Sequence, residues 1–185
     1  NFMVEATNMA LGSITENAAL LKKTYVPKYI FTMARVTSSL VNMIFSLGAM
    51  LVVFIVCGVN WNIFMLFIPV IILQVYLFSL GLGLFLAQST VFFRDIRHLY
   101  SAFTMAWMYL TPIFYPITML PDWLRTCVIM FNPMYGYIQQ FRMIVLDGQM
   151  PGGRMVLIGF AVGGFWMLLG TWSFLKTQNK FILYI

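Results

Sequence analysis

The side chains that could carry out acid–base or metal chemistry are few in this chain. Its one histidine, His98, stands in a short polar segment with Arg94, Asp95 and Arg97. No phosphate-binding loop of the G-x-x-x-x-G-K type and no Gly-x-Ser-x-Gly nucleophile elbow occurs. An intramembrane metalloprotease would need histidine and acidic ligands within an apolar segment, and the apolar segments hold none. The sequence therefore predicts no enzyme, no metal site and no cofactor bound by this chain.

A set of aromatic side chains could bind a carbohydrate rather than react with it. Phe103 and Trp107 are four residues apart and share one helix face, to which Tyr100 adds. Such a stripe could line a conduit and stack on sugar rings without a fixed charge. In membrane helices such a stripe is more often typical of helix packing or of an interfacial belt, and both interpretations stay open. The candidate lining residues are Tyr76, Phe103, Trp107, Tyr109 and Tyr115.

The third set is basic and lies near the start of the chain, where residues 17–28 include three lysines. Ser13 and Glu16 have the spacing of a capping box, which predicts that a short helix begins there. Pro27 would end this helix. A short amphipathic helix suits a soluble partner that binds it, whereas the alternative is a basic anchor on anionic lipid.

The composition decides what kind of element must position these residues. Of 185 residues, 62% are hydrophobic and only 9% are charged, and no soluble fold of this size could bury so much apolar surface. The sequence therefore predicts an all-α, polytopic membrane protein. Because the basic residues alternate with apolar segments, the net charge of +6 indicates topology and headgroup contacts rather than nucleic-acid binding.

The apolar segments predict four complete spans. No charged residue occurs from Val36 to Phe93, and a straight helix of that length would measure ~87 Å, nearly three times the ~30 Å hydrocarbon core. The segment must therefore fold into a hairpin, which turns near Gly58 and Asn60. The predicted spans cover residues 36–56, 63–87, 99–115 and 155–175.

The remaining segments are amphipathic. Residues 117–154 contain uncharged stretches too short to span, and Tyr137, Phe141 and Ile144 recur at helical spacing, so interfacial or re-entrant helices are expected there. Residues 1–35 are expected to hold the end of an earlier span and a cytoplasmic helix, and residues 36–185 the transmembrane domain. We expect the N-terminal part of the full protein to be missing.

The distribution of basic residues predicts the orientation and the energy source. Eight of the eleven lie before the hairpin, after it or at the C-terminus, so these segments are expected in the cytoplasm. The four predicted spans hold no ionisable group of the kind that ion-coupled transporters and voltage sensors use. If the protein transports a substrate uphill, the energy should therefore arrive through the cytoplasmic loops from a partner.

Small residues at i, i+4 spacing mark surfaces where helices can approach closely. Gly159 and Gly163 form such a pair in the last span, and Gly83 and Ala87 form another in the second span of the hairpin. These pairs are typical of packing within one chain, and they also occur at dimer interfaces. Both interpretations stay open.

Three ordered motifs resemble the type-2 ABC exporter permeases that export O-antigen, capsule and teichoic acid. The first is the segment from Asn17 to Ile30, NAALLKKTYVPKYI, and the second is Phe92-Phe93-Arg94-Asp95-Ile96. The third combines Pro112-Ile113-Phe114-Tyr115-Pro116 with Asn132-Pro133-Met134-Tyr135. Together they cover most of the chain in the order that this family shows.

The resemblance implies six spans in the full subunit, a homodimer, and a separate cytoplasmic ATPase that binds ATP and magnesium. It implies that one group of residues couples to the ATPase: Asn17, Leu21, Lys22, Lys23, Tyr25, Pro27, Arg94 and Asp95. It implies that a second group forms an outer gate: Pro121, Trp123, Asn132, Pro133, Tyr135 and Arg142.

The sequence thus predicts the membrane subunit of an ATP-driven exporter of a lipid-linked cell-envelope polysaccharide or teichoic acid, in a bacterial cytoplasmic membrane. Its expected partners are the ATPase, a second copy, membrane lipids and the glycan. The alternatives are a type-2 permease for a drug or small lipid and a passive channel without an ATPase.

Overall fold

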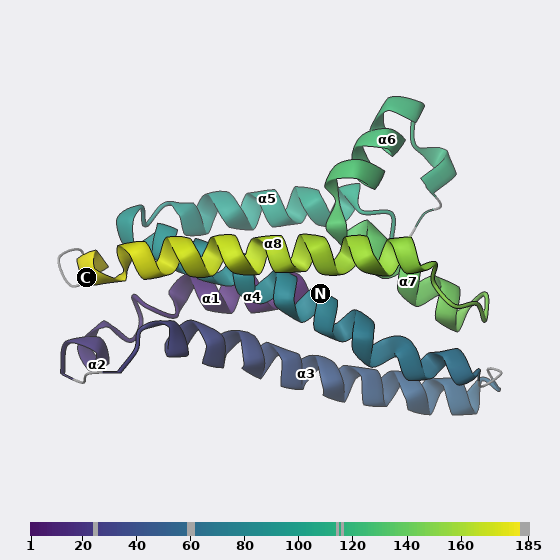
Figure 1. Cartoon of the computed structure of the whole chain (residues 1–185), viewed down its shortest axis with the longest axis horizontal. Coiled ribbons are helices and arrows are strands. Elements are labelled where there is room, and N and C mark those ends of the chain that lie inside the picture. The colour runs from purple at the N-terminus through teal and green to yellow at the C-terminus, as the bar shows by residue number, and fades with distance from the viewer. Residues whose placement is uncertain (24–25, 59–61, 114, 116, 182–185) are drawn as a thin grey trace.

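The structure, a computed structural model, describes residues 1–23, 26–58, 62–113, 115 and 117–181. Every regular element in these ranges is helical, which confirms the all-α prediction. The helices form an elongated bundle (Figure 1). In chain order they are α1 (Phe2–Gly12), α2 (Ala18–Lys23), α3 (Tyr29–Val56), α4 (Ile68–Phe92), α5 (Ile96–Leu110), α6 (Asp122–Phe131), α7 (Pro133–Val145) and α8 (Gly153–Thr177). Three 3-10 turns, η1 (Ile63–Phe67), η2 (Ile117–Met119) and η3 (Gln178–Lys180), complete the described elements.

Three helical stretches in the described part of the chain are long and apolar enough to cross a membrane. They cover Tyr29–Val56, Ile63–Phe92 and Gly153–Lys180. The first begins before the predicted start at Val36, and the second continues past the predicted end at Ala87. They correspond to three of the four predicted spans.

The predicted span over residues 99–115 is not among these three long apolar helices. Helix α5 has 15 residues, or ~22 Å at 1.5 Å per residue, and it ends at Leu110. Thr111 takes an extended conformation, with φ −78° and ψ 121°, because the ring of the following Pro112 disfavours a helical residue before it. The proline pair was expected to stop or kink this helix, and the stop comes before the predicted end of the span.

Helices α4 and α8 pack most closely, and glycines make this possible. A Cβ atom at Gly81 would overlap the backbone of Trp166, and one at Gly170 would overlap the carbonyl oxygen of Gly81. At Gly163 a Cβ atom would lie 3.1 Å from the backbone oxygen of Gln74. The glycine spacing in α8 therefore serves packing within this chain.

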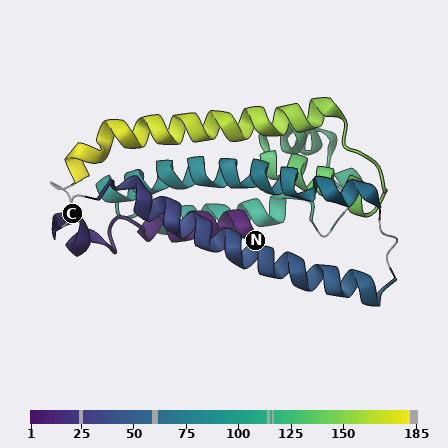
Figure 2. The ribbon, with the colours of Figure 1, turned by 60° about the horizontal axis from the view of Figure 1, so that its bottom comes forward.

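Helix α1 lies inside the bundle against α3 and α4. Ala6 and Ala10 are fully buried, and a Cβ atom at Gly83 of α4 would lie 3.0 Å from the Cβ of Ala10. The Tyr100 hydroxyl of α5 donates a hydrogen bond to Thr7 Oγ1 over 2.8 Å. Residue 1 lies about midway along the bundle in both ribbon views (Figures 1 and 2).

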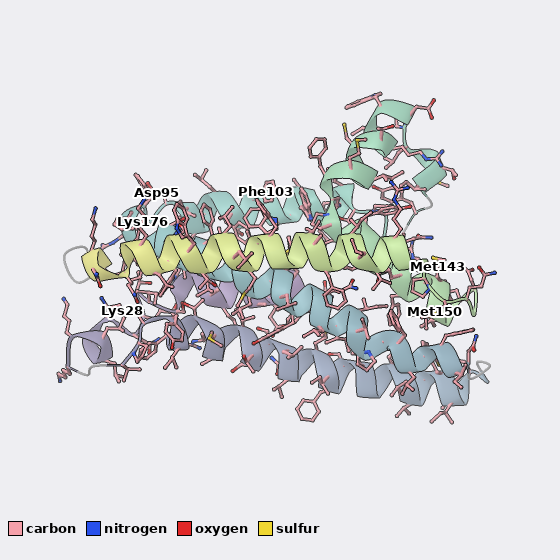
Figure 3. The ribbon with its side chains drawn as sticks, in the orientation of Figure 1. Lys28, Asp95, Phe103, Met143, Met150 and Lys176 are labelled. Atoms are coloured by element: carbon pink, nitrogen blue, oxygen red, sulfur yellow. The ribbon has the colours of Figure 1, made fainter. Side chains whose placement is uncertain are left out.

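The two ends of the bundle differ in composition. One end, here called the basic end, holds α2, the first turns of α3 and α5, and the last turns of α8 (Figure 1). Lys28, Asp95 and Lys176 gather there, whereas Met143 and Met150 lie at the opposite end (Figure 3). This places the segments that were predicted to face the cytoplasm together at one end.

Candidate functional site

A carboxylate at the basic end bridges two helices that are distant in sequence. Glu16, in the turn between α1 and α2, forms ion pairs with Arg35 of α3 over 3.5 Å and with Arg97 of α5 over 3.4 Å. Each of the three side chains is about half exposed. We call these residues the Glu16 cluster. It connects the basic segment at residues 17–28 to the second polar loop, which sequence reasoning had considered separately.

The turn that positions Glu16 depends on Gly12 and Ser13. A Cβ atom at Gly12 would overlap the Glu16 carboxylate and lie 2.8 Å from Arg97 Nη2. Ser13 Oγ donates to the carbonyl of Ala10 over 2.6 Å, and the same carbonyl accepts from the Ser13 backbone amide over 3.0 Å at the end of α1. It also lies 2.8 Å from Thr32 Oγ1.

The predicted capping box at Ser13 and Glu16 is therefore wrong. The Ser13 hydroxyl is used at the end of α1, and Glu16 pairs with two arginines instead of capping a helix start. Helix α2 begins later, at Ala18, and Asn17 Nδ2 donates to the carbonyl of Ser13 over 2.8 Å. The local capping-box motif does not form here, and both side chains contact partners far away in the sequence.

The predicted coupling residues of the first loop include both buried and exposed side chains. Leu21 is buried in the main apolar core, which attaches α2 to the bundle. Lys22 and Lys23 are exposed in the last turn of α2, and Pro27 is exposed before α3. Tyr25 lies outside the described residues. The surface presented by this loop is therefore basic.

The predicted coupling residues of the second loop, Arg94 and Asp95, are exposed just before α5. Within the described part of the chain, neither side chain forms a hydrogen bond or ion pair. Their neighbour Arg97 makes the tertiary contact, and sequence reasoning did not select it. Glu16 and Arg97 carry opposite charges and lie in two loops that were expected on the same side of the membrane. These charges alone, however, could not identify the two residues as a pair.

A further contact at the basic end joins the start of α3 to the C-terminal turn. Lys28 Nζ donates to the carbonyl of Gln178 over 2.5 Å and lies 5.6 Å from the ring centre of Phe181. Partial burial lowers the pKa of Lys28. Segments from both halves of the chain are thus connected at the basic end.

The predicted lining residues do not form one continuous surface. Phe103 and Trp107 of α5 stack at 5.2 Å between ring centres, and Phe103 is 54% exposed. Tyr109 is also exposed, and the Tyr115 hydroxyl donates to its carbonyl over 2.9 Å. Tyr76 instead lies toward α3, with its hydroxyl 3.0 Å from Thr37 Oγ1. In the described part of the chain no ring contact or hydrogen bond joins Tyr76 to the α5 aromatics.

Two residues of the predicted outer gate connect α7 to the end of α5. Asn132 Nδ2 donates to Thr111 Oγ1 over 2.8 Å, and its Oδ1 accepts from the Met134 amide over 3.0 Å at the start of α7. Arg142 Nη2 donates to the carbonyl of Ile113 over 2.7 Å. These bonds attach α7 to the end of α5, the helix that carries the aromatic stripe.

The other predicted gate residues contribute in different ways. Pro133 begins α7, where its missing N–H costs no helical hydrogen bond. Pro121 precedes α6, and Trp123 on α6 is exposed. Tyr135 borders a groove between α7 and α8. The structure shows helices where the sequence predicted interfacial or re-entrant ones, without assigning them a depth in a membrane.

We expect Asn132→Ala to destabilise this end of the protein by about 1–3 kcal/mol, because it removes a helix cap and leaves the Thr111 hydroxyl without its donor. Thermal unfolding of the purified protein in detergent measures this loss. Asn132→Ser is the matched control, since it keeps an N-cap acceptor without adding a charge at this buried position and loses the bond to Thr111. Equal melting temperatures for wild type and Asn132→Ala would show that the junction contributes nothing.

Comparison with known proteins agrees with this architecture. Residues 2–146 match the family model described as ABC-2 type transporter. Two similar proteins are both named O-antigen export system permease protein RfbA. The Myxococcus xanthus protein is 28% identical over 154 residues, which cover 82% of this chain and 58% of that protein. A Klebsiella pneumoniae protein is 25% identical over 181 residues, which cover 97% of this chain and 69% of that protein.

The chain thus spans little more than half the length of the first of these relatives. The family match covers α1 to α7, which include the Glu16 cluster, the α5 aromatic stripe and the Asn132 junction. The sequence motifs, the all-helical fold and this match lead to the same assignment. The chain belongs to the ABC-2 type transporter family.

Proposed function

We propose that this chain forms part of the permease of an ATP-driven exporter that moves a lipid-linked cell-envelope polysaccharide across the bacterial cytoplasmic membrane. The observation that carries the proposal is the family match over residues 2–146, together with relatives that are named as O-antigen export permeases. ATP and magnesium would be bound by a separate ATPase, and two copies of the permease would enclose the conduit.

The physical support for an external energy source is the charge distribution. The three long apolar helices hold no Asp, Glu, Lys, Arg or His between Val36 and Phe93 or between Met155 and Leu175. The exposed polar groups of the first two loops lie at the basic end. In this mechanism, ATP-driven closure of the ATPase displaces α2 and the Arg94–Asp95 loop, and the helices separate to admit the glycan.

The path for the glycan would follow the exposed face of α5. Phe103 and Tyr109 are exposed there, and aromatic faces bind sugar rings without a fixed charge. Helix α7 would act as the outer gate through its bonds from Asn132 and Arg142 to the end of α5. Tyr76 would take part only if the helices rearrange, since it lies toward α3.

The test is a double substitution in the full-length protein, Arg94→Ala with Asp95→Ala. We expect at least a fivefold loss of co-purified ATPase, because both exposed polar groups at the docking loop are removed; ~1 kcal/mol corresponds to about this ratio. The matched control is Asp122→Ala with Arg125→Ala, which removes the same two residue types from α6 at the opposite end.

Unchanged co-purification would contradict the assignment of this loop. If no ATPase associates with the wild-type protein, the passive-channel alternative is favoured. If the ATPase binds but cell-surface polysaccharide is unaffected by deletion of the permease, a drug or small-lipid substrate replaces the glycan.

A further inference from the structure

A groove between α7 and α8 has no role in the proposed transport mechanism. It has a volume of about 600 Å³ and is bordered by the α6–α7 junction, by α7 and by the first half of α8. The residues of α8 that border it are Arg154, Met155, Ile158, Gly159, Val162 and Trp166, and Gly152 borders it just before the helix. It lies at the end of the bundle opposite the basic end, where Met143 also borders it (Figure 3).

One charged side chain borders the groove, at the start of α8. Arg154 is exposed, and among the described residues its side chain has no ion pair or hydrogen bond. It lies in the first turn of α8, which Gly152 precedes without a side-chain cap, so the first amides of this 25-residue helix are available to an anion. A cation and a helix N-terminus here favour a negatively charged group.

A buried amide lies deeper along the same wall. Gln140 is 1% exposed, and its Nε2 donates to Gln74 Oε1 over 3.1 Å. Its own Oε1 has no donor in the described part of the chain, although an unpaired buried acceptor costs free energy. The Gln74 amide is anchored to the carbonyl of Val156, half a turn after Arg154. An occupant with a hydroxyl group could supply the missing donor after a small side-chain movement.

The remaining length of the groove is apolar. From Arg154 to Trp166 the helix rises ~18 Å, close to the ~15 Å thickness of one hydrocarbon leaflet. Met155, Ile158 and Val162 line this distance. The groove therefore has a charged group at one end and an apolar length close to that of one leaflet. These features match a single amphiphile whose chain lies parallel to α8.

We propose that this groove binds one anionic phospholipid, with its phosphate at Arg154 and the N-terminus of α8 and an acyl chain along α8 toward Trp166. The charge of Arg154 and the leaflet-like length of the groove favour a lipid over a second copy of the chain. An interface between two copies would bury the unpaired charge of Arg154, which costs free energy. The lipid would fill the space between the gate helix α7 and α8 and so stabilise their relative position.

The first test titrates phosphatidylglycerol against phosphatidylcholine into the full-length protein in detergent and measures bound lipid by native mass spectrometry. Wild type is expected to prefer phosphatidylglycerol. Arg154→Gln should weaken phosphatidylglycerol binding about fivefold, the ratio for the ~1 kcal/mol that one basic residue contributes near a membrane surface. Arg125→Gln on α6 is the matched control and should bind as wild type does. Equal binding by both variants would overturn the proposal.

The second test places a larger side chain in the groove. Ile158→Trp fills the groove, whereas Leu157→Trp makes the same change on the adjacent residue, which is 69% exposed and does not border the groove. We expect only Ile158→Trp to lose the bound lipid. If Ile158→Trp instead changes the oligomeric state and leaves lipid binding intact, the groove is an interface between copies and the proposal fails. Neither measurement requires an ATPase or a glycan, so failure here leaves the proposed function standing.

Discussion

Gly170→Ala is expected to destabilise the folded protein strongly. The added methyl group would overlap the carbonyl oxygen of Gly81. The methyl carbon is bonded directly to the α8 backbone and the oxygen belongs to the α4 backbone, so neither can move aside as a flexible side chain can. Overpacking by one methyl group typically costs about 1–3 kcal/mol, and we expect at least the upper value because α4 and α8 must separate along their length. Detergent-solubilised protein should show a lower melting temperature and early aggregation in size-exclusion chromatography.

The matched control is Gly164→Ala on the same helix. A Cβ atom at Gly164 meets nothing within 4 Å, so this variant should fold with wild-type stability or slightly above it, because alanine favours a helix by about 1 kcal/mol over glycine. Gly81→Ala should reproduce the defect of Gly170→Ala from the other side of the contact. If Gly170→Ala and Gly164→Ala melted alike, the α4–α8 contact would not be as close as described.

The elements that the sequence predicted well are those set by hydropathy. The uncharged stretch from Val36 to Phe93 could only form a hairpin of two long helices, and α3 and α4 follow. Helical spacing also predicted α7, and the glycine pair at Gly159 and Gly163 marked a packing surface. These patterns are local, and the apolar environment they imply leaves few alternatives.

Hydropathy was a poorer guide where backbone chemistry decides the outcome. The aromatic segment after Leu99 is apolar enough to suggest a span, yet the Thr111–Pro112 step ends α5 after 15 residues. In the same way the Ser13–Glu16 spacing satisfied a local motif, while the folded chain gave both side chains distant partners, Thr32 for Ser13 and two arginines for Glu16.

For the candidate site, the sequence predicted the two separate loops but not the contacts that join them. The basic loop and the Arg94–Asp95 loop were recognised, but nothing in the sequence indicates that α1 ends beside α5. That proximity results from the burial of Ala6 and Ala10 against α4 and from the Thr7–Tyr100 hydrogen bond. Glu16 reaches Arg97 only because α1 and α5 are held together in this way.

Charge reversal at Glu16 is the second large effect that we expect, and it acts on coupling more than on folding. Each exposed ion pair contributes only ~0.2–1 kcal/mol, so the protein should still fold. Glu16→Lys, however, places a third cation beside Arg35 and Arg97, and the turn before α2 loses both of its ion pairs. If the proposed function is correct, ATPase binding should persist while polysaccharide export falls about tenfold.

Two further variants separate this effect from a general change of surface charge. Asp122→Lys makes an equal change in net charge on α6, far from the basic end, and should export normally. Glu16→Lys combined with Arg97→Glu restores an ion pair of opposite polarity between the first turn and α5, and should recover part of the export. Recovery would mean that the link between the two loops, rather than the acidic residue itself, carries motion from the ATPase to the helices. Export by Glu16→Lys at the wild-type level would remove the cluster from the mechanism.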